Sequence, residues 1–203
     1  MGHNPDFWRA RWRANQIAFH QPNPSALLVE NYPLFKPAPK SRVLVPLCGK
    51  SKDLVWLVEQ GHEVVGVEVA EQAVQAFKEE EGEHENLRLL CADFFALRPK
   101  ELGTFDWVFD RGALAAIDYE TQPKYVLQTL SFLKPSGRVF LIAVEYDETR
   151  MSGPPFSVPD GKVRSLYAGA KLIERLADRD CLEQRFVERG LSAMREAAYA
   201  ITM

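Results

Sequence analysis

The chain has 203 residues, of which 46% are hydrophobic and 26% charged, as expected for one globular domain. Its net charge of -3 does not indicate the basic surface that binds nucleic acid. The apolar run at residues 139–144 is far too short to span a membrane. The three cysteines form no C-x-x-C pair and the four histidines no ligand cluster, so the sequence predicts neither a disulfide framework nor a metal site.

The N-terminal sequence lacks the charged and then apolar pattern of a secretory signal. We therefore expect a cytoplasmic protein that acts on small molecules, without nucleic acid or membrane partners. We also expect it to be a monomer.

Residues 4–15 predict a helix that begins with an Asn-Pro-Asp capping signal. Trp8 and Trp12 are four residues apart and share one face, where their indole rings could attract a cation such as a sulfonium. The alternative is that the two rings only dock the helix on the domain. The proline-punctuated segment 17–24 predicts an ordered loop, in which Phe19 is a candidate lid residue, and a short helix is expected at 25–32.

The central stretch 42–68 reads as a strand, a glycine turn, a helix, a second strand and an acid. Gly49 lets the backbone approach a ligand, and Glu68, nineteen residues later, ends a run of apolar strand-forming residues. In a doubly wound sheet, an acid at this place binds the two hydroxyls of a ribose. The turn lacks G-x-G-x-x-G, which disfavours a dinucleotide and favours S-adenosylmethionine. An ordinary turn followed by a chance acid remains the alternative.

Two further strand ends carry candidate ligand-binding side chains. After a helix at 71–81, the strand at 87–91 is followed by Ala92, Asp93 and Phe94, where an acid and an aromatic ring could hold an adenine; alternatively, Asp93 caps a helix. The next strand begins at Phe105 and runs into Asp110-Arg111-Gly112. This charge pair could lie in a cleft, or it could be a salt bridge that only fixes the loop.

The remaining pattern defines the fold class. A helix at 121–133, a turn at 134–137 and a strand at 138–146 precede a long loop at 147–161. A helix near 162–167 and strands near 171–177 and 193–201 complete the chain. Repeated β-α units predict an α/β fold with a doubly wound, mostly parallel sheet, helices on both faces, and a final antiparallel hairpin.

Several of these motifs, in this order, resemble the thiopurine S-methyltransferase family over the whole chain. They are Phe7-Trp8, Trp12, 17–21 (IAFHQ), 44–50 (LVPLCGK), 61–68 (GHEVVGVE), 110–114 (DRGAL) and 153–156 (GPPF). The resemblance implies a class I methyltransferase fold with a seven-stranded sheet and an S-adenosylmethionine donor. It also implies a sulfur or other soft nucleophile as acceptor. The single domain 1–203 would then consist of a helical lid segment (1–40) and a Rossmann-like core (41–203).

The same resemblance implies roles for individual residues. At the cofactor these are Trp8, Trp12, Leu47, Gly49, Glu68, Ala92, Asp93, Phe94 and Arg111. Phe19 would lie against the acceptor. The segment between Phe77 and Leu87 is shorter than in the well-known thiopurine enzymes, and in this respect the chain is similar to halide and thiol methyltransferases.

For catalysis, the resemblance implies an in-line methyl transfer without a covalent intermediate. Arg111 is expected to stabilise an acceptor thiolate, and Asp110 is a weaker candidate for accepting its proton. The alternatives are a methyltransferase acting on halide, thiocyanate or another small soft nucleophile, and a cofactor-binding module without turnover. A nicotinamide oxidoreductase is a further alternative, against which the missing glycine fingerprint counts.

Overall fold

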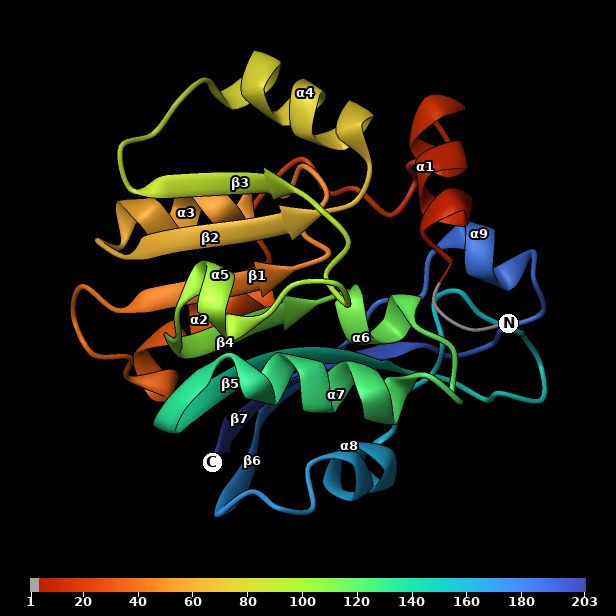
Figure 1. Cartoon of the computed structure of the whole chain (residues 1–203). Helices are drawn as coiled ribbons and strands as arrows, with labels where there is room; N and C mark the ends of the chain where they lie inside the picture. The colour runs from red at the N-terminus through yellow and green to blue at the C-terminus, as the bar shows by residue number, and fades with distance from the viewer. Residues whose placement is uncertain (1–3) are drawn as a thin grey trace.

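A seven-stranded sheet runs through the computed structural model, which describes residues 4–203 (Figure 1). In spatial order, its strands are β3 (Leu87–Cys91), β2 (Glu63–Glu68), β1 (Arg42–Pro46), β4 (Phe105–Arg111), β5 (Leu133–Glu145), β7 (Arg195–Thr202) and β6 (Leu172–Asp180). Strands β1 to β5 are parallel, and β7 is antiparallel to both β5 and β6. The predicted α/β fold, doubly wound with an antiparallel C-terminal strand, is confirmed.

Helices connect and cover these strands. They are α1 (Pro5–Arg13), α2 (Ala26–Phe35), α3 (Asp53–Glu59), α4 (Glu71–Glu81), α5 (Pro99–Leu102), α6 (Ala113–Ala116), α7 (Gln122–Ser131), α8 (Asp160–Leu166) and α9 (Gln184–Val187). The sequence pattern does not predict α5, α6 and α9, because four residues are too few to show a helical period. None of the helices described for residues 4–203 has the length and apolar composition that a bilayer crossing requires.

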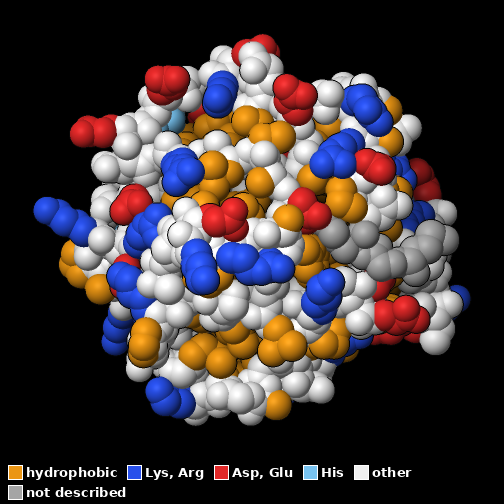
Figure 2. All heavy atoms as spheres, viewed as in Figure 1, with side chains coloured by type: hydrophobic (Ala, Val, Ile, Leu, Met, Phe, Trp, Pro, Cys, Tyr) orange, Lys and Arg blue, Asp and Glu red, His pale blue; other side chains and the backbone are white. Residues whose placement is uncertain are grey.

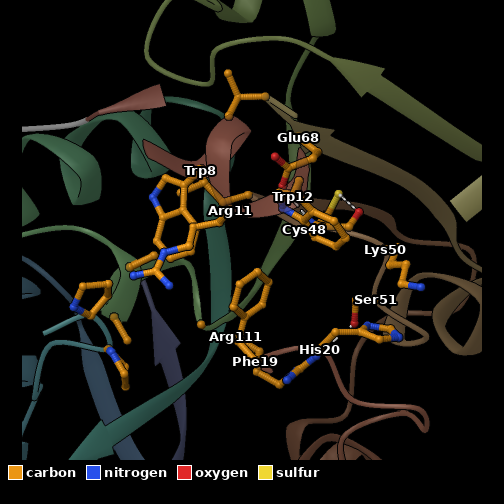
Figure 3. Close-up of a pocket in the computed structure, with 18 of the residues that line it drawn as sticks. Trp8, Arg11, Trp12, Phe19, His20, Cys48, Lys50, Ser51, Glu68 and Arg111 are labelled. Carbon is orange, nitrogen blue, oxygen red and sulfur yellow. Dashed lines mark hydrogen bonds between the residues drawn. The ribbon is translucent and has the colours of Figure 1, made fainter. Parts of the chain in front are cut away.

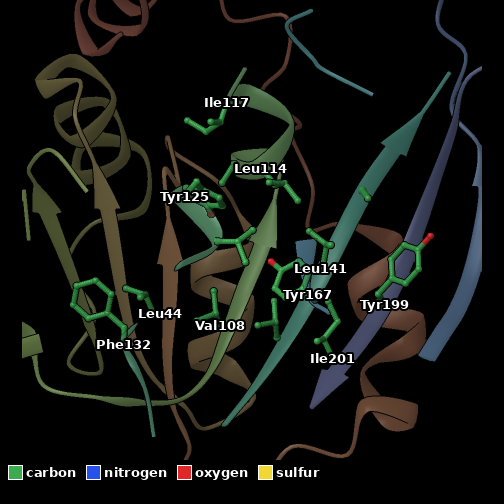
Figure 4. Packing of buried hydrophobic residues seen from close by; sticks show 14 of the residues in the cluster. Leu44, Val108, Leu114, Ile117, Tyr125, Phe132, Leu141, Tyr167, Tyr199 and Ile201 are labelled. Carbon is green, nitrogen blue, oxygen red and sulfur yellow. The ribbon is translucent and has the colours of Figure 1, made fainter. Parts of the chain in front are cut away.

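Side chains alternate between the two faces of the sheet and form two apolar layers. Leu44, Val108 and Leu141 project from β1, β4 and β5 toward α6 and α7 (Figure 4). On the other face, Val43 and Phe109 pack with α2 and α3. Burying each such side chain stabilises the fold by about 1.5–3 kcal/mol, so both layers hold the strand ends in place. Lys and Arg side chains are interspersed with Asp and Glu on the face shown in Figure 2, which leaves no field of one sign there.

The structure places the predicted lid segment in two different settings. Leu27, Leu28 and Phe35 of α2 are buried against the sheet. In contrast, α1 packs on the start of α4, at the carboxyl edge of the sheet. Within the described part of the segment 1–40, α1 thus lies at the carboxyl edge of the sheet, whereas α2 belongs to a core layer.

Strand β5 begins earlier than the sequence indicates. Leu133 pairs with Phe105 and Arg138 pairs with Trp107, so the intervening residues bulge out of the ladder. Ser136 in this bulge has a left-handed φ of 61°. The expected turn at 134–137 is thus a bulge within a longer strand, because a Pro-Ser-Gly sequence suits either structure.

Candidate active site

A cavity of about 320 Å³ opens at the carboxyl ends of β1, β2 and β4. This is where the strand order reverses, since the chain passes from β1 to β2 and β3 on one side and to β4 and β5 on the other. Open parallel sheets bind ligands at such a switch point. The walls come from α1 and its following loop, the turn after β1, the strand ends, Pro154 and Pro155, and α9. Figure 3 shows Trp8, Glu68 and Arg111 around this cavity.

Three aromatic rings from the N-terminal segment cover one side of the cavity. The ring of Phe19 meets Trp8 edge to face at 5.6 Å and Trp12 at 5.7 Å between centroids. Asn4 caps α1 by accepting the N–H of Phe7, and Arg9 Nε donates to the carbonyl of Val69 at 3.3 Å. These contacts fix the helix that carries both indoles over the end of β2.

The turn after β1 brings the backbone to the cavity. The strand ends at Pro46, and Leu47 and Gly49 follow with left-handed φ angles of 48° and 55°. Such a conformation costs a residue with a side chain about 1–2 kcal/mol, which neighbouring contacts must offset. At Gly49, a Cβ atom would lie 3.0 Å from the Trp12 ring, so any other residue would combine a strained φ with a tight contact.

Glu68 is buried at the end of β2 and lines the same cavity. Its Oε2 accepts the N–H of Gly49 at 2.9 Å, and its Oε1 accepts the N–H of Ala70 at 2.7 Å. Burial raises the pKa of this carboxyl, and the backbone amides of Ala70, Gly49 and Val69 oppose that shift by favouring the ionised form. A carboxylate has about four acceptor positions, so acceptor capacity remains for a ligand beyond these backbone contacts.

Arg111 extends into the cavity from the end of β4, and two side chains accept hydrogen bonds from its guanidinium. Its Nε donates to Oδ2 of Asp53 at 2.7 Å, and its Nη2 donates to Oγ of Ser51 at 3.1 Å. Asp53 is only 1% exposed, and its other oxygen accepts the N–H of Ser25 at 2.7 Å. The guanidinium is therefore oriented by a buried acid, while two of its five N–H donors are used in these contacts.

Asp110 does not pair with Arg111, contrary to the sequence-based expectation. Successive residues of a strand point to opposite faces, so the two side chains diverge. Asp110 is fully buried beneath α6 and α7, where it accepts the N–H of Leu114 at 3.1 Å and the hydroxyl of Tyr125 at 2.7 Å. Burial raises its pKa to about 6. It lies outside the cavity lining and is 0% exposed, so the structure does not bring this side chain to the site.

The residues after β3 are divided between the cavity and the core. Ala92 and Phe94 line the cavity, whereas Asp93 lies outside the lining. Its Oδ1 accepts the N–H of Phe95 at 3.0 Å within a turn, so it does not cap a helix, since α5 begins at Pro99 with Arg98 as its N-cap. Phe94 is 2% exposed and packs on Tyr125, so it belongs mainly to the core.

Several cavity residues carried no assigned role in the sequence. These are Arg11, His20, Lys50, Ser51, Arg185 and Arg189. Arg185 donates to the carbonyl of Ala18, and Arg189 donates to the carbonyl of Pro154 at 3.2 Å. The two arginines are four residues apart, a spacing that places two side chains on the same face of a helix. The sequence does not reveal this helix, because it is too short to show a helical period. In the lining, five cationic side chains thus face one acid, Glu68.

Comparisons with known proteins place this geometry in a family. The family model described as thiopurine S-methyltransferase matches residues 3–203. The chain belongs to the thiopurine S-methyltransferase family. Among curated members, it is 38% identical to the thiopurine S-methyltransferase of Nitrosospira multiformis over 212 residues, covering 97% of this chain and 96% of the relative. It is 40% identical to that of Pseudomonas putida KT2440 over 215 residues, covering 98% and 99%.

Solved structures agree on the fold. The 1,6-didemethyltoxoflavin-N1-methyltransferase of Burkholderia thailandensis, solved with S-adenosylhomocysteine, superimposes with a TM-score of 0.67 at 17% identity, covering 98% of this chain and 87% of that one. An arsenic(III) S-adenosylmethionine methyltransferase from Chlamydomonas reinhardtii gives 0.64 at 13% identity, covering 81% and 64%. As a member of the thiopurine S-methyltransferase family, the chain is an S-adenosylmethionine-dependent methyltransferase, and the halide alternative is not favoured.

The cavity residues fit S-adenosylmethionine chemically. Glu68 offers a charged acceptor with unused capacity, which suits a pair of ribose hydroxyls. The indole faces of Trp8 and Trp12 suit a sulfonium. The close approach of the backbone at Gly49 suits a ligand that passes over the turn.

Proposed function

We propose that this methyltransferase transfers a methyl group to the sulfur of a thiol or thiopurine by in-line displacement. The observation that carries the proposal is one cavity lined by the aromatic rings of α1, by Glu68 from β2 and by Arg111 from β4. S-adenosylmethionine, when bound, supplies a methyl carbon made electrophilic by a positively charged sulfur. The protein must then align the acceptor, exclude water and stabilise negative charge on the acceptor sulfur.

The cofactor side of the site would be formed by the ends of β1, β2 and β3. Glu68 would hold the ribose hydroxyls, while Leu47 and Gly49 would border the methionine part. Ala92 and Phe94 would border the adenine. This division follows the spatial order of the strands, in which β2 lies between β1 and β3.

The acceptor side would lie between Phe19 and Arg111. The rings of Trp8 and Trp12 would cover the sulfonium, and Phe19, which touches both, would pack on the acceptor. Arg111 would lower the pKa of the acceptor thiol, because a nearby cation favours a thiolate. Its ion pair with Asp53 keeps the guanidinium in one orientation during this step.

Water would be excluded by the segment that follows α1. The bond from Arg185 to the carbonyl of Ala18 ties this segment to α9. We further propose that the enzyme acts as a cytoplasmic monomer with a lid at its N-terminal end, as expected from the sequence. These three points stay predictions.

The proposal is tested by incubating the protein with methyl-labelled S-adenosylmethionine and a competing mixture of a thiopurine, an aromatic thiol, iodide and thiocyanate. The label is expected on the sulfur of the organic acceptors. Label only in methyl iodide or methyl thiocyanate would contradict the acceptor class. Cofactor binding by calorimetry without any labelled product would indicate a binding module without turnover.

A further inference from the structure

The structure leaves the site without the proton acceptor that the sequence suggested. Asp110 is buried on the other face of the sheet, bonded to Leu114 and Tyr125. A thiol of alkaline pKa must still lose its proton before its sulfur can attack. The base must therefore be sought among the residues that line the cavity.

Of the described cavity residues, three can in principle take a proton near neutral pH: Glu68, Cys48 and His20. Glu68 already accepts two backbone amides and is the group suited to the ribose. Burial raises the pKa of the Cys48 thiol well above its ordinary value, so it stays protonated. The imidazole of His20 is the remaining candidate.

His20 is placed by contacts on both sides of its loop. The preceding residue, Phe19, packs on Trp8 and Trp12, and the carbonyl of Ala18 accepts Arg185. The backbone N–H of His20 donates to the carbonyl of Ile17 at 2.8 Å, which closes the turn. In Figure 3, the His20 ring lies beside Ser51, on the wall that also carries Lys50.

We propose that His20 is the general base that removes the proton from the acceptor thiol. This assignment rests on the proposed function, because it requires a sulfur acceptor in the cavity. His20 comes directly after Phe19, the residue expected to pack on the acceptor. Both His20 and Arg111 line the cavity. Arg111 would hold the sulfur as an anion while His20 takes the proton.

The electrostatic surroundings of His20 keep it in the form that can accept a proton. Burial lowers its pKa, and Lys50, Lys52 and Arg111 lower it further, whereas Glu80 opposes them. Glu80 is itself paired with Lys50 at 2.5 Å, which weakens its effect on the ring. The imidazole is therefore neutral near pH 7 and ready to act as a base.

The step balances within the proposed reaction. The thiol S–H bond breaks, the proton goes to the free ring nitrogen of His20, and the electron pair stays on the acceptor sulfur. That pair forms the new S–CH₃ bond while the old bond between the methyl carbon and the donor sulfur breaks, leaving its pair on the donor sulfur as a thioether. The imidazolium then returns its proton to water.

The test compares two acceptors in the wild-type enzyme and in His20→Gln. One is 4-nitrothiophenol, which is ionised in neutral water, and the other is phenylmethanethiol, which is not. We expect His20→Gln to lose about 100-fold in kcat/KM for phenylmethanethiol and to keep near wild-type turnover of 4-nitrothiophenol. His84→Gln, the same change in the connection between α4 and β3 outside the cavity, should leave both rates unchanged.

The pH profile separates a base from a residue that only binds. With phenylmethanethiol, the wild-type kcat/KM should be level between the pKa of His20 and that of the thiol. In His20→Gln it should instead rise tenfold per pH unit, because only free thiolate reacts. In His20→Ala, added imidazole should restore turnover of phenylmethanethiol but leave 4-nitrothiophenol unaffected.

Three results would overturn the assignment of His20. They are equal losses for the two thiols, a level pH profile retained in His20→Gln, and an absence of imidazole rescue. A wild-type enzyme that methylates neither thiol would instead remove the proposed function, and the role of His20 with it. Turnover of 4-nitrothiophenol by the variant also reports that it is folded and binds the cofactor.

Discussion

The carboxylate of Glu68 accepts the backbone N–H of Gly49 at 2.9 Å, so the end of β2 is bonded directly to the turn after β1. Glu68 therefore has two tasks, since it shapes the turn and offers its remaining acceptor positions to the ribose. A substitution at Glu68 should affect both tasks.

We predict that Glu68→Gln weakens S-adenosylmethionine binding by about 1.5–3 kcal/mol, or roughly 10- to 100-fold in Kd, because uncharged hydrogen bonds replace charge-assisted ones. It should also lower the Tm, since the amide NH₂ faces a backbone N–H. Isothermal calorimetry and thermal unfolding measure the two effects. Glu63→Gln, at the exposed start of β2, is the matched control and should leave the Kd unchanged. An unaltered Kd in Glu68→Gln would remove Glu68 from the cofactor site.

Trp8→Leu should reduce affinity for S-adenosylmethionine more than affinity for S-adenosylhomocysteine. Only the former carries the sulfonium charge, and an indole face contributes about 0.5–2 kcal/mol to binding a cation. Trp8 suits this test better than Trp12, which is buried against Gly49. The two dissociation constants are compared by calorimetry, with Trp56→Leu on α3 as a control indole away from the cavity. Equal losses for both ligands would show that Trp8 contributes packing alone.

Arg111→Lys should lower kcat most for thiols of alkaline pKa. Lysine keeps the charge but loses the fork that binds Asp53 and Ser51 together, so the cation is no longer fixed. Rates for a series of thiols of different pKa measure this, and the level pH profile expected from His20 should persist. If the loss is the same for every thiol and cofactor affinity falls in parallel, Arg111 is a cofactor ligand and not a thiolate stabiliser.

Asp110 predicts how stability depends on pH. Its pKa is raised from 3.8 to about 6 by burial, so between these values the native state holds a proton that the unfolded chain has lost. The free energy of unfolding gains a contribution from this carboxyl that is full below pH 3.8 and is lost as the pH rises through 6. The contribution is on the order of 3 kcal/mol. Denaturant unfolding at several pH values should show a free energy of unfolding that falls as the pH rises through 6.

Two variants check that this slope belongs to Asp110. Asp110→Asn should remove the decline, because the amide does not titrate. Tyr125→Phe should extend it to higher pH, since the Tyr125 hydroxyl favours the ionised carboxylate and lowers the pKa. A decline that persists unchanged in Asp110→Asn would assign it to another group.

Elements with a clear period could be predicted from the sequence, and α4 and β3 have the predicted bounds. Glu68, Gly49 and the two tryptophans lie at the cavity because strand ends and helical spacing fix their places. The ion pair between Arg111 and Asp53 could not be predicted. The two residues are 58 positions apart in the chain and come together only because of the order of the strands in the sheet. Strand alternation could have separated Asp110 from Arg111, but the attraction between adjacent opposite charges suggested a pair.

The bond between Arg185 and the carbonyl of Ala18 joins residues 167 positions apart. It therefore bears on the order in which the protein is assembled during synthesis. The ends of β1, β2 and β3, with Glu68, leave the ribosome well before the wall formed by α9, which follows β6 in the chain. Contacts of such long sequence separation form late. We expect a nascent chain to assemble the cofactor side first, and methyl transfer to begin only after α9 has packed against the segment that follows α1.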